Sequence, residues 1–510
     1  MSQLFESIEE FSAYFKVLWT SGKPLAKLFR TNEKGYLYDT GTNALLSCDD
    51  LEFNLLNNLF KYDVDKALNI SATQCSSDEF FRALNGIRTL IEGAGILATR
   101  SHIRFGGSHF SDLKDMVNSR LGMIQLETTE RCNLRCGYCL YDSHYRFKRN
   151  HGTRDMHQDI AFKAIDLLAK NSRWKDSVAV TFYGGEPLLR VPFIMSCINY
   201  SRDRMKDKEV HFSITTNATL ITPTLANYLA EKEINMHVSI DGPQDIHDQY
   251  RRDIKGNGSF QRAISGLKYL FDAYGDKRKS ISLSMVYAPP YSIDKVERVS
   301  QLWDQYPWLP RDIGINISNA RGMSTKDTYI RNNNDDSLFE WAKSRYIKDY
   351  CHGQLSHPIA SSILNKQLVR IVKRPVYKNP LETYCLNGCC IPGSRKLFVS
   401  VDGTLSVCER VESVCAIGSV EDGVNFDMLE KTYIKEYADK SIPNCSTCWA
   451  LQMCSICYVH SFHDGQFDMV RKERSCALMI KRTLDLLILL CGLLEINKTG
   501  LDFLTDWKVM

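Results

Sequence analysis

Strand-like and helix-like segments alternate from about residue 120 to residue 320, and this alternation constrains the fold more than any other feature of the sequence. The strand-like segments are short and apolar, and helical patterns of apolar residues lie between them. The expected strands read LGMIQLETT, SVAVTFYGG, VHFSITTNA, INMHVSIDG, SISLSMVYAP and DIGINISNA. Such alternation is typical of βαβ units around a parallel sheet. We therefore expect an α/β fold whose sheet is open or rolled into a full or partial barrel.

Length and composition indicate several domains and give no sign of a nucleic-acid or membrane partner. A chain of 510 residues exceeds the ~250–300 residues that one core usually organises. The net charge is only +4, so neither nucleic acid nor an anionic membrane is expected as a partner. The N-terminal MSQLFESIEEFSAYF is acidic and lacks the apolar stretch of a secretory signal, so we expect a cytoplasmic protein. In that reducing compartment the 18 cysteines favour metal or cluster binding over disulfides.

A first group of cysteines follows the first strand of the alternating region. Cys132, Cys136 and Cys139 have the spacing C-x3-C-x2-C. Sites in parallel α/β folds gather at the carboxyl ends of strands, so a reactive centre is expected in this loop. A structural zinc site would need a fourth ligand. A four-iron cluster held by three thiolates would instead leave one iron open to a small molecule.

This array resembles the C-x3-C-x-aromatic-C hallmark of the radical S-adenosylmethionine (SAM) superfamily, with Tyr138 at the aromatic position. The resemblance implies a partial (β/α)6 barrel similar to a TIM barrel. It also implies a [4Fe-4S] cluster on Cys132, Cys136 and Cys139, with SAM chelated to the open iron. Reductive cleavage of SAM would then give a 5′-deoxyadenosyl radical, so that the cofactor carries the difficult chemistry.

A second segment, TFYGGEPLL, resembles the Gly-Gly-Glu motif of the same superfamily. The matching residues are Gly184, Gly185 and Glu186. Glycines let the backbone approach a ligand closely, and the resemblance assigns this motif to the methionine amino group of SAM. The segment is also typical of a tight strand-to-helix turn, with Pro187 at the start of the helix.

Two further strand ends, TTNATL and SIDGP, resemble segments that contact the ribose or carboxylate of SAM. The resemblance places Asn217, Ser239 and Asp241 at the cofactor. Arg252 follows in HDQYRRDIKGNGSF and could pair with a carboxylate through two hydrogen bonds. A solvated surface arginine is the alternative for Arg252.

Cysteines become dense again between residues 385 and 476. This region resembles the SPASM domain of radical SAM enzymes, which binds two auxiliary [4Fe-4S] clusters, so that three clusters are expected in total. The spacing departs from the family at the last pair, which is C-x2-C here instead of C-x3-C and ends at Cys457. A zinc ribbon is the alternative, but its two knuckles normally lie ~15–20 residues apart and these two are much closer.

The resemblance also implies which cysteines hold which cluster. The first auxiliary cluster takes Cys390, Cys408, Cys457 and an upstream cysteine, for which Cys385 is preferred and Cys389 is the alternative; an open iron is a third option. The second auxiliary cluster takes Cys445, Cys448, Cys454 and Cys476.

Glu409 directly follows Cys408. In some SPASM enzymes an acid at this position takes a proton from the substrate, so Glu409 is the candidate general base. An exposed charge beside Arg410 is the alternative.

The N-terminal region contains a hairpin pattern, GYLYDTGTNALL, and a helical pattern, SCDDLEFNLLNNLF, with Ser47 or Asp49 as the N-cap. This combination resembles the winged-helix-like leader-binding element of peptide maturases, which takes up a leader peptide as an added edge strand.

We therefore expect five parts along the chain. They are a leader-recognition domain at 1–105, a radical SAM core at 115–320, a helical bridge at 321–384, a SPASM domain at 385–485 and a C-terminal helix at 486–510, with a polar linker at 104–115.

The whole pattern most resembles maturases of ribosomally made peptides that install thioether crosslinks between a cysteine sulfur and a carbon. It implies a precursor peptide with a leader as partner, and an electron donor such as flavodoxin or ferredoxin. The alternative enzyme is an anaerobic sulfatase-maturating enzyme that forms formylglycine. A zinc-stabilised peptide-binding scaffold is the alternative from another class.

Overall fold

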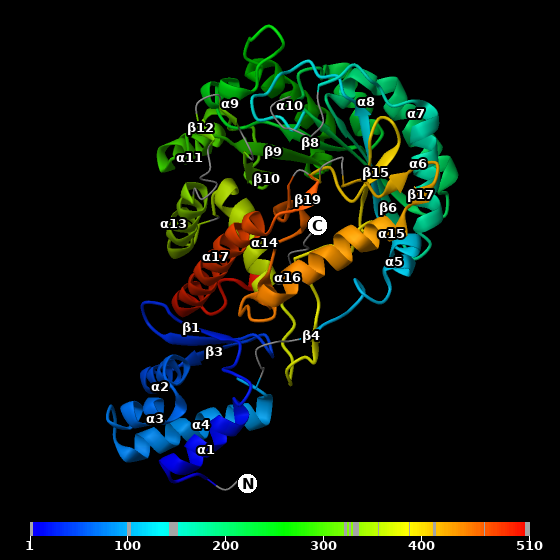
Figure 1. Cartoon of the computed structure of the whole chain (residues 1–510). Helices are drawn as coiled ribbons and strands as arrows, with labels where there is room; N and C mark the ends of the chain where they lie inside the picture. The colour runs from blue at the N-terminus through cyan, green and yellow to red at the C-terminus, as the bar shows by residue number, and fades with distance from the viewer. Residues whose placement is uncertain are drawn as a thin grey trace.

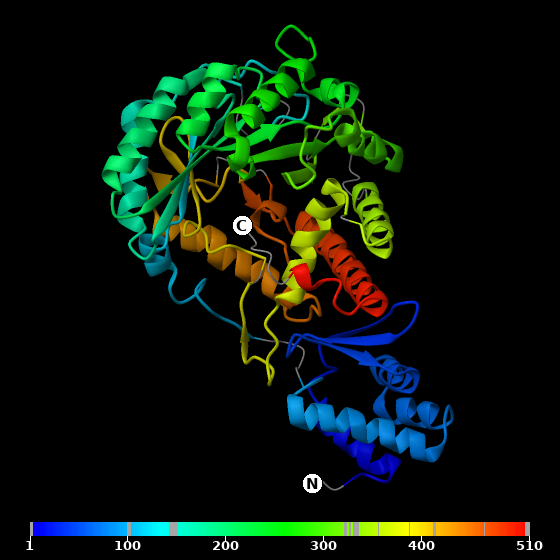
Figure 2. The same ribbon diagram turned by 180° about the vertical axis from the view of Figure 1, so that it is seen from behind.

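The computed structural model describes residues 4–98, 104–141, 151–320, 324–325, 328–329, 336–354, 356–386, 388–411, 415–463 and 465–504. The N-terminal part lies at one end of the molecule and the strand–helix barrel at the other, with the cysteine-rich part between them (Figures 1 and 2).

The N-terminal part is a three-stranded antiparallel sheet packed on helices, with its own hydrophobic core. Its elements are α1 (Ile8–Leu18), β1 (Ala26–Arg30), β2 (Gly35–Asp39), β3 (Ala44–Cys48), α2 (Asp50–Lys61), α3 (Val64–Ala72) and α4 (Ser77–Ala94). The expected hairpin is confirmed, since β2 pairs antiparallel with β3. Asp49 is the N-cap of α2 and forms a capping box with Glu52, so Asp49 and not Ser47 caps the helix.

Six parallel strands form the central sheet, in the order β10-β9-β8-β7-β6-β5. They are β5 (Met123–Thr129), β6 (Ser177–Gly184), β7 (Glu209–Thr216), β8 (Asn235–Ser239), β9 (Ile281–Tyr287) and β10 (Gly314–Asn319). The helices between them are α6 (Gln158–Asn171), α7 (Val191–Arg204), α8 (Pro223–Glu231), α9 (Gln244–Tyr250), α10 (Phe260–Tyr274), α11 (Ile293–Ser300) and α12 (Leu302–Gln305). The predicted α/β fold with a partial barrel of parallel strands is confirmed.

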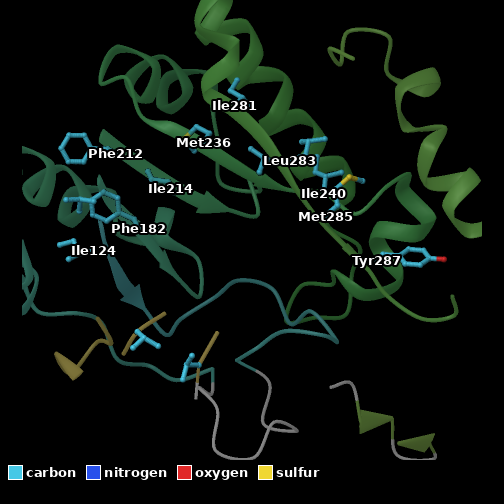
Figure 3. Close-up of a cluster of buried hydrophobic side chains, with 14 of the residues drawn as sticks. Ile124, Phe182, Phe212, Ile214, Met236, Ile240, Ile281, Leu283, Met285 and Tyr287 are labelled. Carbon is cyan, nitrogen blue, oxygen red and sulfur yellow. The ribbon is translucent and has the colours of Figure 1, made fainter. Parts of the chain in front are cut away.

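Alternate residues of these strands build the main core against the helices. In β9, Ile281, Leu283 and Met285 are buried while the residues between them are half-buried. Figure 3 shows these side chains together with those of Met236 from the neighbouring strand β8 and Ile214 from β7. The period of two fixes which face of each strand meets the helices, and so which face is left for the barrel interior.

The cysteine-rich part continues the same sheet. β14 (Leu397–Val399) pairs parallel with β5, and β15 (Thr404–Ser406), β16 (Gly418–Ser419) and β17 (Gly423–Val424) extend the sheet antiparallel to ten strands. Helices α15 (Phe426–Leu429) and α16 (Tyr437–Cys445) follow, joined by a π-helical segment at Glu430–Glu436. The small hairpin of β18 (Phe462–His463) and β19 (Gln466–Phe467) precedes α17 (Met469–Ile496).

Three expected boundaries need correction. The segment expected as a polar linker contains β4 (Arg104–Phe105), which pairs parallel with β13 (Thr383–Tyr384), and α5 (Leu113–Ser119). A strand of two residues has too little pattern to be seen in sequence. The helix expected at 486–510 begins at Met469, because Asp468 caps it there, and it ends at Ile496. Residues 505–510 of that expected helix lie outside the described residues.

In the described part of the expected bridge at 321–384 lie the helices α13 (Ser337–Cys351) and α14 (Pro358–Val372) and the short pair β11 (Ser324–Thr325) and β12 (Thr328–Tyr329). Among the described residues, every helix is too short or too polar to cross a membrane.

Candidate functional site

The three-cysteine loop lies at the carboxyl end of β5, where the sequence placed it. Cys132, Cys136 and Cys139 are all half-buried. The backbone N–H of Leu134 points at Cys132 Sγ at 3.4 Å, and that of Tyr141 points at Cys139 Sγ at 3.4 Å. Burial, then the carboxylate of Glu186 and then the charges of Cys136 and Cys139 raise the pKa of the Cys132 thiol to about 12. Buried sulfurs that receive N–H groups and repel one another fit thiolates bound to an iron–sulfur cluster.

Gly184 and Gly185 are needed where the end of β6 crosses the cysteine loop. The N–H of Gly185 donates to Thr129 O at 2.7 Å, and a Cβ on Gly185 would lie 2.1 Å from Arg131 O. Gly184 has φ +124°, and a Cβ there would lie 2.4 Å from Thr129 O. The sequence attributed these glycines to the approach of a ligand; the structure also shows a close approach between two backbone segments.

Glu186 is almost fully buried, and its carboxylate is surrounded by donors from this chain. Thr216 Oγ1 donates at 2.7 Å, Asn217 N at 2.8 Å and Leu188 N at 3.1 Å. Burial raises the pKa of Glu186, and these hydrogen bonds act against that shift. The carboxylate therefore ties the end of β6 to the end of β7, and Pro187 begins the short 3-10 helix Pro187–Arg190.

Asn217 connects the hydrogen bonds around Glu186 to the cysteine loop. Its Nδ2 donates to Asn133 Oδ1 at 2.9 Å and lies 3.9 Å from Cys132 Sγ, while its Oδ1 accepts from the backbone N–H of Thr219 at 3.0 Å. The side chain therefore lies at the first cysteine of the array, with its own orientation fixed.

Tyr138 and Asp241 meet in a buried network on the other side of the loop. The Tyr138 hydroxyl donates to Asp241, and Arg251 donates to the same carboxylate from Nε at 2.9 Å and from a terminal nitrogen at 3.2 Å. Val286 N donates to Asp241 at 2.9 Å. Burial raises the pKa of the Cys136 thiol, while the Arg251 guanidinium lowers it, so that arginine also borders the cluster loop. Ser239 lies at the carboxyl end of β8 and is largely buried.

From the sequence we expected Arg252 to pair with a carboxylate, yet Arg251 is the arginine that binds Asp241 in this network. Arg251 is 7% exposed, whereas Arg252 is exposed and its Nε donates to Asp248 O at 2.9 Å. The two residues are adjacent and chemically identical, so only the turn after α9 decides which one faces the barrel.

The second auxiliary set of cysteines is brought together by α16, α17 and the loop between them. Burial, and then the charges of Cys445, Cys476 and Cys448 in that order, raise the pKa of the Cys454 thiol to about 12. The N–H of Ile456 points at Cys454 Sγ at 3.4 Å. All four predicted ligands therefore lie within electrostatic reach of one another.

The first auxiliary set is less compact. Burial and then the charge of Cys457 raise the pKa of Cys390. Tyr433 lies near both Cys408 and Cys390, since their charges add to the effect of burial that raises its pKa. Cys385 is exposed beside Gly107, where a Cβ would lie 2.8 Å from the Cys385 sulfur.

Cys389, the alternative to Cys385, is buried between the two auxiliary sets. Burial raises its pKa, a hydrogen bond with Tyr437 lowers it, and the charges of Cys457, Cys390 and Cys454 raise it. The choice between Cys385 and Cys389 stays a prediction.

Within the described ranges, no three His, Cys, Asp or Glu side chains are gathered tightly enough to be ligands of one metal ion. A four-iron cluster distributes its cysteines over separate iron atoms.

Glu409 is mostly buried and ion-paired. Its carboxylate accepts from Lys396 Nζ and lies 3.6 Å from Arg410 Nε. Lys396 Nζ also donates to Gln125 Oε1 on β5 at 3.2 Å. Burial alone would raise the pKa of Glu409, but Lys396 and then Arg410 hold it below its usual value. The alternative of an exposed charge is therefore wrong, since only 15% of the side chain is exposed.

Comparisons with known proteins agree on the central region. Residues 126–302 match the model of the Radical SAM superfamily. The chain is 24% identical to the cysteine-type anaerobic sulfatase-maturating enzyme of Clostridium novyi (strain NT), over 66% of this chain and 86% of that protein. It is 30% identical to the radical SAM cyclopropyl synthase TigE of Paramaledivibacter caminithermalis, over 30% of this chain and 34% of that protein.

A solved structure, native anSMEcpe with bound AdoMet, has a similar fold. The TM-score is 0.54 and the sequence identity 19%, over 73% of this chain and 99% of the other.

Proposed function

Because this chain is an enzyme that carries a radical SAM domain at residues 126–302, we propose that it forms thioether crosslinks in a ribosomally made precursor peptide. The domain implies SAM and one [4Fe-4S] cluster; two auxiliary clusters on the later cysteines are part of the proposal. The enzyme assignment sets aside a zinc-stabilised binding scaffold.

One observation carries the proposal further than the superfamily does. β14 pairs with β5, so the cysteine-rich part begins beside the strand that leads into Cys132, Cys136 and Cys139. The same pairing brings Lys396 and Glu409 to Gln125 of β5. The candidate proton acceptor Glu409, held by Lys396 just before β14, and the loop of Cys132, Cys136 and Cys139 after β5 therefore lie at neighbouring strands, β14 and β5, of one continuous sheet.

When bound, SAM and the clusters supply the radical that removes a hydrogen atom from the substrate and an acceptor for the electron released as the bond forms. The residues of this chain would hold these groups and orient them. Tyr138, Asp241 and Arg251 form a fixed polar wall beside Cys136, and Glu186 locks the ends of β6 and β7. Glu409, kept ionised by Lys396, takes the proton that the substrate thiol loses.

The precursor peptide would bind first to the N-terminal part. In the strand order β1-β2-β3, β1 and β3 are the two edge strands among the described residues, and an extended leader could add a fourth strand to one of them through backbone hydrogen bonds. An electron donor such as flavodoxin or ferredoxin is a further proposed partner.

Formylglycine formation is the second candidate. It is supported by the 24% identity to a sulfatase-maturating enzyme over 66% of this chain. In that case the substrate cysteine would lose its sulfur, whereas a thioether retains it.

The radical site is tested by replacing its cysteines. The variant C132A/C136A/C139A, reconstituted anaerobically with iron and sulfide, is expected to make no 5′-deoxyadenosine from SAM and to hold less iron. Cys351 is exposed and belongs to no proposed set, so C351A is the matched control and should behave like the wild type. Continued 5′-deoxyadenosine production by the triple variant would place the radical cluster elsewhere.

The reaction type is tested by mass spectrometry of a co-expressed candidate peptide. Each thioether removes two hydrogens and keeps sulfur, while formylglycine formation replaces sulfur with oxygen. Loss of a general base typically costs about 10²–10⁴-fold in rate, so E409Q should lower product formation by that factor while SAM is still cleaved. The exposed Glu421, paired with Lys163, provides the control E421Q. Unchanged crosslinking by E409Q would remove Glu409 from the mechanism.

A further inference from the structure

Lys472 is a fully buried lysine in the first turns of α17. Only 2% of the residue is exposed, although lysine is among the residues least often buried. Its backbone N–H donates to Asp468 O at 3.1 Å, which fixes its place just after the N-cap of the helix. A buried ammonium costs several kcal/mol unless a negative group compensates it.

The group that faces Lys472 is a cysteine sulfur. Lys472 Nζ lies 3.6 Å from Cys445 Sγ and 5.8 Å from the centre of the Tyr437 ring. In the part of the chain that the structure describes, no carboxylate lies within ion-pair distance of this ammonium. Its neighbour Glu473 is exposed and accepts instead from Asn444 Nδ2 at 3.1 Å. The compensating charge is therefore expected from a thiolate.

The positive charge reaches more than one cysteine of the second set. It lowers the pKa of the Cys476 and Cys448 thiols, where burial raises it, while its ammonium contacts Cys445 directly. One buried cation therefore contacts or electrostatically influences three of the four proposed ligands of the second auxiliary cluster.

We propose that Lys472 is a positioning residue that raises the reduction potential of the second auxiliary cluster through its charge and its hydrogen bond to Cys445. The proposal rests on the proposed assignment of Cys445, Cys448, Cys454 and Cys476 to that cluster. One-electron reduction adds one negative charge to a cluster and makes or breaks no bond. A fixed positive charge and an N–H···S hydrogen bond both favour the reduced form, and these are known determinants of cluster potential.

The consequence concerns the crosslinking reaction. A cluster that is easier to reduce is a better acceptor for the electron released when a sulfur–carbon bond forms. Lys472 would thus bias the second cluster toward accepting electrons.

The test compares charge removal with charge retention in the full-length reconstituted enzyme. K472M removes the ammonium but keeps a long apolar side chain, and K472R keeps the charge. K440M is the matched control, because Lys440 also lies over an aromatic ring, that of Phe467, but is exposed and paired with Glu436. Reduction is followed by electron paramagnetic resonance during titration with dithionite. The transition that disappears in C445A/C448A identifies the second cluster.

The potential of that transition should fall in K472M, stay near the wild-type value in K472R and not change in K440M. Loss of the second cluster in K472M with retention in K472R would overturn the proposal, because it would show that the charge retains the cluster instead of setting its potential. An unchanged potential in a K472M enzyme with full iron content would overturn the proposal, as would loss of the cluster in both Lys472 variants. If C445A/C448A retained all its iron, the cluster assignment itself would fail and the role of Lys472 with it.

Discussion

At the scale of single residues, the cysteine loop depends on two residues without a side chain, Gly184 and Gly185. Gly184 and Gly185 allow the end of β6 to cross the loop at a distance that no side chain would permit. The crossing is fixed by hydrogen bonds from Gly185 N and Glu186 N to carbonyls of Thr129 and Arg131. The Gly-Gly-Glu motif therefore shapes the loop as well as any ligand site.

The change G185A is expected to destabilise the protein and to lower its iron content. Its Cβ would lie 2.1 Å from Arg131 O, a backbone atom that cannot move without shifting Cys132. The control G93A lies in α4 with nothing within 4 Å of the added methyl group, and glycine in a helix interior costs ~0.5–1 kcal/mol relative to alanine. Thermal unfolding and iron analysis should therefore separate the variants, with G93A at or above wild-type stability. Equal stability of both would mean that the loop adapts.

At the scale of elements, α14 begins at an unusual cap. His357 Nδ1 accepts from Ile359 N at 3.2 Å, so the ring must be neutral at that nitrogen, and Nε2 donates to Ser300 O at 3.3 Å. The ring packs edge-on against Trp303 and Trp341. Burial, and next the charge of Arg345, lower the pKa of His357 to about 4.

This cap makes the start of α14 sensitive to acid. The pKa of His357 is lower in the folded state than the ordinary value of about 6.5, so its contribution is present above pH ~6.5 and is lost as the pH falls toward about 4. The shift corresponds to about 3 kcal/mol. H357N keeps a capping side chain that does not titrate. Urea unfolding should show a smaller loss of stability between pH ~7 and ~5 for H357N than for the wild type; equal losses would rule out this origin.

At the scale of the whole molecule, the N-terminal part is joined directly to the second cysteine set. Thr40 Oγ1, at the tip of the β2–β3 hairpin, donates to Trp449 O at 2.7 Å, and Gln452 Nε2 donates back to Thr40 O at 3.2 Å. Trp449 directly follows Cys448. Arg374 Nε also donates to Asn43 O at 2.8 Å. The hairpin therefore supports the loop that carries Cys448 and Cys454.

The change T40V tests this support. Removing the hydroxyl leaves the part-buried Trp449 carbonyl without that donor, and a typical hydrogen bond contributes about 0.5–1.5 kcal/mol. Hydrogen exchange and proteolysis of the 445–454 loop should become faster. The control T20V removes a hydroxyl that bonds only to carbonyls of its own helix, α1, and should leave the loop unchanged. Equal exchange in both variants would mean that the hairpin does not stabilise the loop.

Much of the architecture follows from the sequence because its signals are local. The alternation of short apolar segments with helical patterns predicted the strands β5 to β10, and the capping box of Asp49 and Glu52 lies within four residues of chain. The C-x3-C-x2-C array was visible because one loop carries all three cysteines. The two-residue strands β4 and β13 were not visible, because their pairing joins residues far apart in the chain.

The sequence by itself thus determined the alternating elements, the position of the C-x3-C-x2-C loop after the first of the six strands, and which cysteines are available as ligands. The tertiary structure alone decided that Arg251 and not Arg252 pairs with Asp241. It also decided that Lys396 forms an ion pair with Glu409, and that Lys472 is buried against Cys445. Spacing and periodicity are properties of neighbouring residues, whereas burial and charge pairing depend on which distant segments fold against one another.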